Sequence, residues 1–202
     1  MTDRPVERGG YHHGSLPEAL VAAALGLLDE LGQQKVTMRE VARRAGVSPG
    51  APFRHFADRD ALLTEVADRV LADFERWQRV EIEDSGGGGG ALRAMGLGFI
   101  RYALQHPHRF ELVRSRVFTT SRQPELEQRL SGIDQAYAGF IMADQEAGRL
   151  RPGDPALVGL AGQALVYGLS QMIIDGYLPA GKAEELAAQV LDTFGQGVAN
   201  PR

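Results

Sequence analysis

The fold is decided by the stretch TMREVARRAGVSPGAPFRHFADRDALL, which runs from Thr37 to Leu63. Its first four residues have the Thr-x-x-Glu pattern of a capping box, which predicts a short helix through Ala45. Gly46 supplies a turn, and the Ser-Pro pair that follows suits the start of another short helix, running to about His55. Two short helices joined by a glycine-containing turn and flanked by arginines are typical of a helix-turn-helix that binds DNA.

Helical periodicity extends from this stretch in both directions, and no segment has the sustained alternation of a β-strand. A helix from Leu16 to Leu31 precedes the stretch, because Ser15 suits its cap and Gly32 its end. Further helices are predicted over residues 59–83, 91–105, 107–118, 124–147, 155–177 and 183–198. The sequence therefore predicts an all-α protein of about nine helices.

The chain is expected to form two domains. Residues 1–14 are predicted to be a flexible arm, and residues 15–60 the helix-turn-helix domain. The helix over residues 59–83 links this domain to a larger helical one, which takes up residues 61–202. Residues 85–90 include five consecutive glycines, which are costly in a helix and predict a surface loop.

The composition excludes several classes of protein. The chain has 202 residues, 44% of them apolar, and is long enough to bury a core. It has no cysteine, which excludes a disulfide framework, a thiolate metal site and a cysteine nucleophile. No uninterrupted apolar stretch approaches the roughly 18 residues of a membrane span, and the N-terminus lacks the apolar segment of a signal peptide. We therefore expect a cytoplasmic protein that does not contact a membrane.

Charge is distributed unevenly along the chain, whose net charge is −4. The segment from Gln33 to Arg59 carries two anions and six cations, which are Lys35, Arg39, Arg43, Arg44, Arg54 and Arg59. A basic segment on an otherwise acidic chain attracts phosphate locally and repels it elsewhere, which orients a protein on DNA. An ordinary solvated helix face would carry the same charges, and charge alone leaves both interpretations open.

Residues 15–63 resemble the signature of the TetR family of bacterial transcription regulators. The resemblance rests on the V-A-x-x-A-G-V-S pattern of residues 41–48 and on the aromatic-x-His-Phe run of residues 53–56. Residues 11–14 and 51–56 resemble one large branch of that family more closely. The resemblance implies a repressor that binds a palindromic double-stranded DNA operator as a homodimer and is released by a small apolar or amphipathic effector.

The family pattern, placed on this sequence, implies which residues contact DNA. They are Thr37, Arg39, Ser48, Pro49, Gly50, Ala51, Phe53, Arg54, His55 and Arg59. Arg54 suits a guanine or a phosphate and Ala51 a thymine methyl group, but no Asn or Gln stands in the recognition helix to read adenine. We therefore expect DNA shape to contribute to specificity. Phe53 replaces the tyrosine usual in the family, so a hydroxyl contact to phosphate is lost, and core packing is the alternative for its ring.

The resemblance also implies an effector cavity among the helices of the larger domain, mostly apolar with a few polar groups. The residues expected to line it are Met95, Phe99, Tyr102, Phe110, Phe118, Tyr137, Phe140, Gln163 and Tyr167. Arg101 and Arg114 are further candidates for its polar groups. The alternative is that this aromatic set forms plain core, as residues at helical spacing often do.

The last two predicted helices are expected to form the dimer interface. The helix over residues 155–177 is rich in small residues, and the helix over residues 183–198 has an apolar stripe. In the family that the chain resembles, these two helices pair with those of a second copy in a four-helix bundle. The alternative is that both only close the core of one chain.

The rival function is a helical enzyme or small-molecule-binding protein in which the N-terminal helices are only scaffold. No carboxylate pair, Ser/His/Asp set, phosphate loop or metal motif stands at workable spacing, so no enzymatic activity, cofactor or metal is predicted. His12 and His13 are adjacent but lack carboxylate or cysteine partners at ligand spacing.

Overall fold

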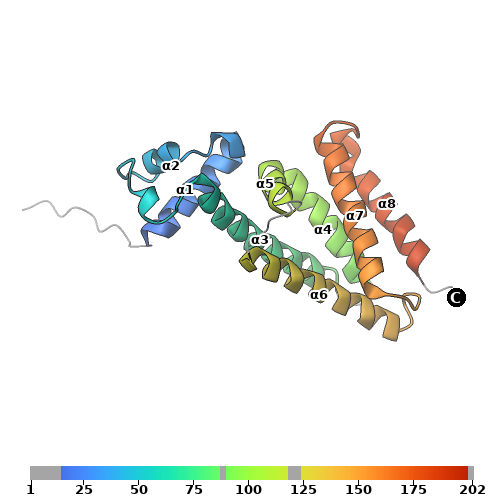
Figure 1. The fold of residues 1–202 in the computed structure, drawn as a ribbon. Coiled ribbons are helices and arrows are strands. Elements are labelled where there is room, and N and C mark those ends of the chain that lie inside the picture. Colours follow the sequence, from blue (N-terminus) through green and yellow to red (C-terminus); the bar gives the residue numbers. More distant parts are fainter. Residues whose placement is uncertain (1–14, 87–89, 118–123, 200–202) are drawn as a thin grey trace, which may run out of the picture. The chain divides into compact units, whose positions relative to one another are not determined.

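The computed structural model describes residues 15–86, 90–117 and 124–199, which form eight α-helices, short 3₁₀ helices and no β-strand (Figure 1). The all-α class predicted from the sequence is confirmed, with eight α-helices in place of about nine. The chain packs as two units, which divide after Val66. The boundary predicted at residue 60 and the observed division both fall within one long helix, α3 (Arg59–Asp84).

Unit 1 contains α1 (Leu16–Leu31), α2 (Met38–Arg44) and the first residues of α3. The predicted caps form: the Thr37 hydroxyl oxygen accepts from the Glu40 amide at 3.2 Å, and an Asp58 carboxylate oxygen accepts from the Ala61 amide at 2.8 Å. The apolar faces of the three helices meet in a core of fully buried residues, which are Leu20, Leu27, Leu28, Val36, Val41, Ala42, Leu62, Leu63 and Val66.

The predicted third helix is the main difference from the sequence analysis. Gly46 forms the expected turn with a φ of +70°, a conformation that favours glycine. Residues 48–55, however, form turns and one short 3₁₀ helix, Pro52–Arg54. Pro52 has no amide hydrogen with which to reach the carbonyl of Ser48, as an α-helix would require. The segment therefore lacks the dipole of a full α-helix.

Unit 2 contains the rest of α3 and five further α-helices, all close to their predicted bounds. They are α4 (Ala91–Gln105), α5 (Pro107–Val117), α6 (Pro124–Glu146), α7 (Pro155–Ile174) and α8 (Ala183–Val198). Helix α4 packs against both α7 and α8, and α6 packs against α7. Helices α4, α7 and α8 share a core of buried residues, which are Leu97, Ile100, Val166, Leu169, Ile173, Ala183, Ala187 and Leu191.

Glycines allow α4 to approach its neighbours closely. A Cβ atom on Gly96 would lie 2.8 Å from a methyl carbon of Leu191 in α8. A Cβ atom on Gly98 would lie 2.7 Å from the Gln78 side-chain oxygen in α3. On the same side, the Trp77 indole donates to the Gly98 carbonyl at 2.9 Å. Helix α4 is thereby fixed against α3 and α8 at once.

Ion pairs hold the second half of α3 to α5 and α6. Arg129 of α6 donates to Asp68 at 2.9 Å and to Glu75 at 3.0 Å. Arg109 of α5 lies 3.3 Å from Asp73. These partly buried pairs fix α3 along its acidic side.

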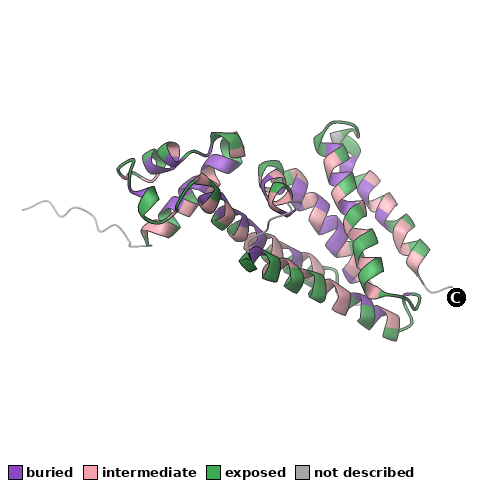
Figure 2. Cartoon of the chain, viewed as in Figure 1, coloured by how far each residue is buried: buried purple, intermediate pink, exposed green. Residues whose placement is uncertain are grey.

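Helix α7 is unusually apolar for a helix that has an exposed side. It is the one helix among the described residues that is long and apolar enough to cross a membrane, with a mean hydropathy of 1.5. Its sequence is interrupted by Gln163, Ser170 and Gln171, and one side packs on α4 and α6. Exposed residues recur along the other side (Figure 2). These features are typical of a helix that packs in a helical bundle.

Candidate nucleic-acid interface and ligand cavity

Three of the six cations in the basic segment have unpaired side chains, and three are paired within unit 1. The exposed side chains of Lys35, Arg39 and Arg54 make no hydrogen bond or salt bridge with any residue that the structure describes. Arg43 pairs with Glu40 of the same helix, with an Nε to oxygen distance of 3.0 Å. Lys35, Arg39 and Arg54 are therefore the cations of this segment for whose side chains the structure gives no partner that would compete with a polyanion.

Arg44 joins α2 to α1 through Glu30. Its Nη1 donates to a Glu30 carboxylate oxygen at 2.7 Å, and this bond holds the pKa of Glu30 below its usual value. The Glu30 carboxylate in turn raises the pKa of Arg44. Since both side chains are substantially exposed, the pair adds little to stability and serves to orient the two helices.

Arg59, a predicted DNA contact, is bound to the backbone of its own unit. Its Nε donates to the carbonyl oxygen of Val36 at 2.6 Å, and its Nη2 donates to that of Gln33. Both carbonyls belong to the connection between α1 and α2. These bonds give Arg59 a structural role in unit 1, and its contact with phosphate stays a prediction.

The remaining predicted DNA contacts differ in exposure. The exposed ones are Thr37, Ser48, Pro49, Gly50 and His55. Phe53 is 57% exposed, so its ring does not pack in the core of unit 1, which was the alternative. Ala51 is buried, which leaves little of its methyl group to contact a thymine. None of these contacts is tested by the structure alone, and each stays a prediction.

Unit 2 contains a cavity of about 590 Å³, within the size range of small-molecule sites. Five of the nine predicted residues line it, namely Met95, Phe99, Tyr137, Gln163 and Tyr167. Apolar residues from other helices complete its wall, including Leu71 and Phe74 of α3, Ile141 of α6 and Phe194 of α8. The cavity is therefore mostly apolar, with its aromatic residues on α3, α4, α6, α7 and α8.

The other predicted pocket residues lie elsewhere. Tyr102 is buried and packs edge-on against Phe74, with ring centroids 5.2 Å apart. It therefore contacts a residue that lines the cavity but does not line the cavity itself. Phe110 is also buried, and it packs against Phe99 and Tyr167. Phe140 is exposed on α6 and does not line the cavity.

The remaining expectations for this pocket concern Phe118 and two arginines. Phe118 lies outside the described residues. Arg101 pairs with Glu81 and Glu184, and Arg114 pairs with Glu111. Neither arginine lines the cavity.

Two tyrosine hydroxyls supply neutral polar groups to the cavity. Burial raises the pKa of Tyr137 and of Tyr167 to about 12, so both hydroxyls keep their protons at neutral pH. The Gln78 amide of α3 donates to the Tyr137 hydroxyl oxygen at 3.3 Å and to the Met95 carbonyl at 3.0 Å. Because the Tyr137 oxygen accepts this bond, its own hydrogen remains available to donate to another acceptor.

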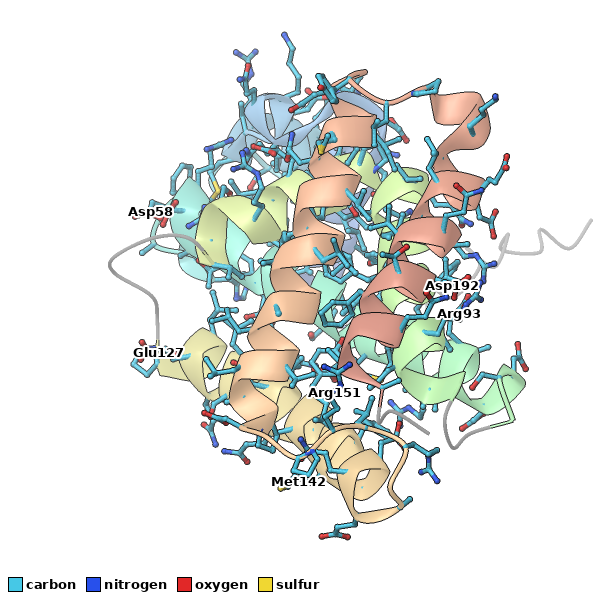
Figure 3. All side chains as sticks on the ribbon, turned by 90° about the vertical axis from the view of Figure 1, so that its right-hand side faces the viewer. Asp58, Arg93, Glu127, Met142, Arg151 and Asp192 are labelled. Carbon is cyan, nitrogen blue, oxygen red and sulfur yellow. The ribbon has the colours of Figure 1, made fainter. Side chains whose placement is uncertain are left out.

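Sequence analysis missed two ion pairs in the cavity wall. Arg93 of α4 donates to Asp192 of α8 at 2.6 Å, and Figure 3 shows the two side chains together. Arg149 donates through Nε to Asp144, near the end of α6, at 2.9 Å. The first pair is separated by 99 residues, so no local pattern reveals it. The second joins residues only five apart, but the sequence analysis made no prediction for either of them.

Each of the two units matches the sequence model of a known protein family. Residues 20–66 match the sequence model described as "Bacterial regulatory proteins, tetR family", and residues 92–194 match "Tetracyclin repressor-like, C-terminal domain". The chain is 40% identical over 57 residues to the class A tetracycline repressor protein from transposon 1721 of Escherichia coli. It is 41% identical over 73 residues to an uncharacterized HTH-type transcriptional regulator of Haemophilus influenzae.

These two matches cover 28% and 34% of this chain and 26% and 35% of the relatives, so they concern only a part of each protein. The solved structures extend the likeness to the whole chain. A Rhodococcus sp. RHA1 protein of unknown function is 26% identical over 96% of this chain and 100% of its own, with a TM-score of 0.86. A TetR-family regulator from Pectobacterium atrosepticum has the same fold, with a TM-score of 0.75 at 17% identity over 92% of this chain and 95% of its own.

The two sequence models together cover most of unit 1 and most of unit 2, in the same order along the chain. Regulators of this kind are DNA-binding transcription factors and not enzymes. The chain belongs to the tetR family of bacterial regulatory proteins.

Proposed function

We propose that this regulator is a repressor that binds a palindromic operator as a homodimer in the cytoplasm and leaves it when a small apolar or amphipathic effector binds. One observation carries the proposal: a single chain combines a helix-turn-helix unit with exposed cations and a second unit with a mostly apolar cavity of about 590 Å³. The first is suited to a polyanion and the second to a small molecule.

Arg39 and Arg54 are the side chains best placed to hold DNA. Both are exposed, and each lies on one of the two elements of the helix-turn-helix. Arginine donates to phosphate oxygens or, in the major groove, to guanine. The segment between Ser48 and His55 offers no amide side chain for adenine, which supports a contribution of DNA shape to specificity.

The exposed side of α7 supports dimerisation through α7 and α8. Leu157, Leu160, Met172 and Ile174 all lie on α7 with large exposed side chains. A second copy that covers them would bury apolar surface, which favours association. A two-fold dimer also presents two recognition elements to two half-sites about one helical turn, roughly 34 Å, apart, which is why we expect a palindrome.

Helix α3 is the proposed link between effector and DNA. It begins in unit 1, and its residues Leu71 and Phe74 line the cavity of unit 2. An effector that binds one position of α3 better than another shifts the population of the DNA-binding state. Trp77 lies on this helix with its indole bonded to the Gly98 carbonyl, so its fluorescence is expected to report effector binding.

The proposal is tested by selecting DNA from a library of genomic fragments with the purified protein at moderate salt. We expect one short palindrome to be enriched, and both Arg39→Ala and Arg54→Ala to lose most of that enrichment. Arg76→Ala is the matched control, because Arg76 is an exposed arginine of unit 2. Equal retention by all four proteins, or no retained sequence, would contradict the proposed interface.

A second experiment tests the dimer. Leu160→Glu places a charge on the exposed side of α7, where a partner copy would cover it. We expect sedimentation to show a dimer for the unmodified chain and mostly monomer for this variant. Unchanged association of the variant would remove this side of α7 from the interface.

A further inference from the structure

The two ion pairs in the cavity wall differ sharply in burial. Arg93 and Asp192 are both about half exposed, with side-chain exposures of 47% and 46%. In the other pair, the Asp144 side chain is only 8% exposed, whereas that of its partner Arg149 is 45% exposed. Asp144 is the one buried carboxylate among the described residues. The cavity wall therefore contains one buried carboxylate, Asp144, whose counter-ion Arg149 is partly exposed to water.

This asymmetry decides which member of the pair a ligand can replace. Arg149 keeps access to water, so its guanidinium can leave the carboxylate and be solvated at little cost. Asp144 has little such access, and a buried carboxylate without a partner is strongly unfavourable. A ligand cation can therefore take the place of Arg149, whereas a ligand anion bound to Arg149 would leave Asp144 buried and unpaired.

One oxygen of Asp144 is left for such a ligand. Both hydrogen bonds from Arg149, through Nε and Nη2, end on Oδ1. The structure gives Oδ2 no hydrogen bond from any residue that it describes, although a carboxylate accepts through both oxygens. The carboxylate thus has unused acceptor capacity in the wall of the cavity.

The rest of the wall suits the body of an organic cation. The rings of Phe74, Phe99 and Tyr167 form a continuous cluster, with centroid distances of 5.5 Å and 4.8 Å between neighbours. Aromatic faces attract cations as well as apolar groups. A ligand with an apolar body and one positive group therefore matches both the rings and the carboxylate.

We propose that the effector is a hydrophobic organic cation, such as an amine, whose positive group pairs with Asp144 in place of Arg149. The proposal rests on the cavity being the effector site, as proposed above, and adds the chemical class of the effector. Arg149 acts as an internal counter-ion that keeps the carboxylate paired until the ligand arrives.

Calorimetric titration of the full-length protein with three probes tests this class. Phenylbutylamine, phenylbutanol and phenylbutyrate share one apolar body and are positive, neutral and negative near neutral pH. We expect the amine to bind about tenfold or more tightly than the other two, because a hydrogen bond to a charged group is stronger than a neutral one.

Substitution of Asp144 is expected to weaken binding of the amine, and substitution of Arg149 is expected to strengthen it. Asp144→Asn keeps the shape and backbone of the residue, and we expect it to abolish the preference for the amine while leaving the affinity for the alcohol unchanged. Arg149→Ala removes the competing cation, so the amine is expected to bind several-fold more tightly. Asp192→Asn is the matched control, because Asp192 also lines the cavity but is half exposed, and it is expected to keep the preference.

Several results would overturn the proposal. They are tighter binding of the acid, equal or absent binding of the three probes, or an amine preference that survives Asp144→Asn. DNA binding of the same samples separates this failure from failure of the proposed function. If a palindrome is still bound, the protein remains a regulator with another class of effector.

Discussion

Removal of the Arg59 side chain is expected to destabilise unit 1. Arg59→Ala deletes two hydrogen bonds from a guanidinium to carbonyl oxygens, one to Val36 at 2.6 Å and one to Gln33. Hydrogen bonds from charged groups contribute about 1.5 to 3 kcal/mol each. Two such bonds would contribute about 3 kcal/mol or more, and the partial exposure of Arg59 weakens them, so we expect the free energy of unfolding to fall by about 2 to 3 kcal/mol.

The assay is urea unfolding of the full chain followed by circular dichroism, with Arg54→Ala as the control. Arg54 carries the same charge in the same unit but is exposed, so its removal is expected to change the free energy of unfolding by less than about 0.5 kcal/mol. Equal midpoints for the two variants would refute the structural role of Arg59. If Arg59→Ala also lost DNA binding while fully stable, the side chain would instead be a phosphate ligand.

Two further predictions concern unit 2. Gly96→Ala is expected to lower the free energy of unfolding by about 1 to 3 kcal/mol, because its Cβ atom would lie 2.8 Å from Leu191. Both variants are compared by the same urea unfolding. Gly132→Ala, in open space on α6, is expected to be neutral or stabilising, and a Gly132→Ala variant less stable than Gly96→Ala would contradict the close packing at Gly96. Folded Tyr137 and Tyr167 keep their protons up to a pKa of about 12, whereas the unfolded chain loses them near 10. Stability is therefore expected to fall as pH rises from 10 to 12, and absorbance titration should show both late ionisations disappear when both tyrosines are replaced by Phe.

Helix bounds were predictable because local residues set them. Helices α1 and α4 have their predicted bounds, since Gly32 and His106-Pro107 end them regardless of the rest of the chain. The third predicted helix was wrong because the start signal at Ser48-Pro49 outweighed Pro52 in the sequence analysis. The second proline removes the amide that an α-helix needs there, and a 3₁₀ helix forms instead.

The cavity was only partly predictable, for a geometric reason. Periodicity places Phe99 and Tyr102 on one helix, but it does not say which residue faces the empty space and which supports it. The pairing of Asp144 with Arg149 was missed because a charged side chain in a sequence is assumed to be solvated unless a partner is visible. Burial of that carboxylate is a result of tertiary packing, which no local pattern around Asp144 reveals.

The most direct test of the account is the salt dependence of operator binding by the unmodified protein and by Arg54→Ala. Each phosphate contact contributes about 0.9 to the slope of log affinity against log salt concentration. A dimer uses Arg54 twice, so the account predicts a slope shallower by about 1.8 in the variant. An unchanged slope would show that Arg54 does not contact the DNA backbone, and an unchanged slope together with unchanged affinity would contradict the proposed interface.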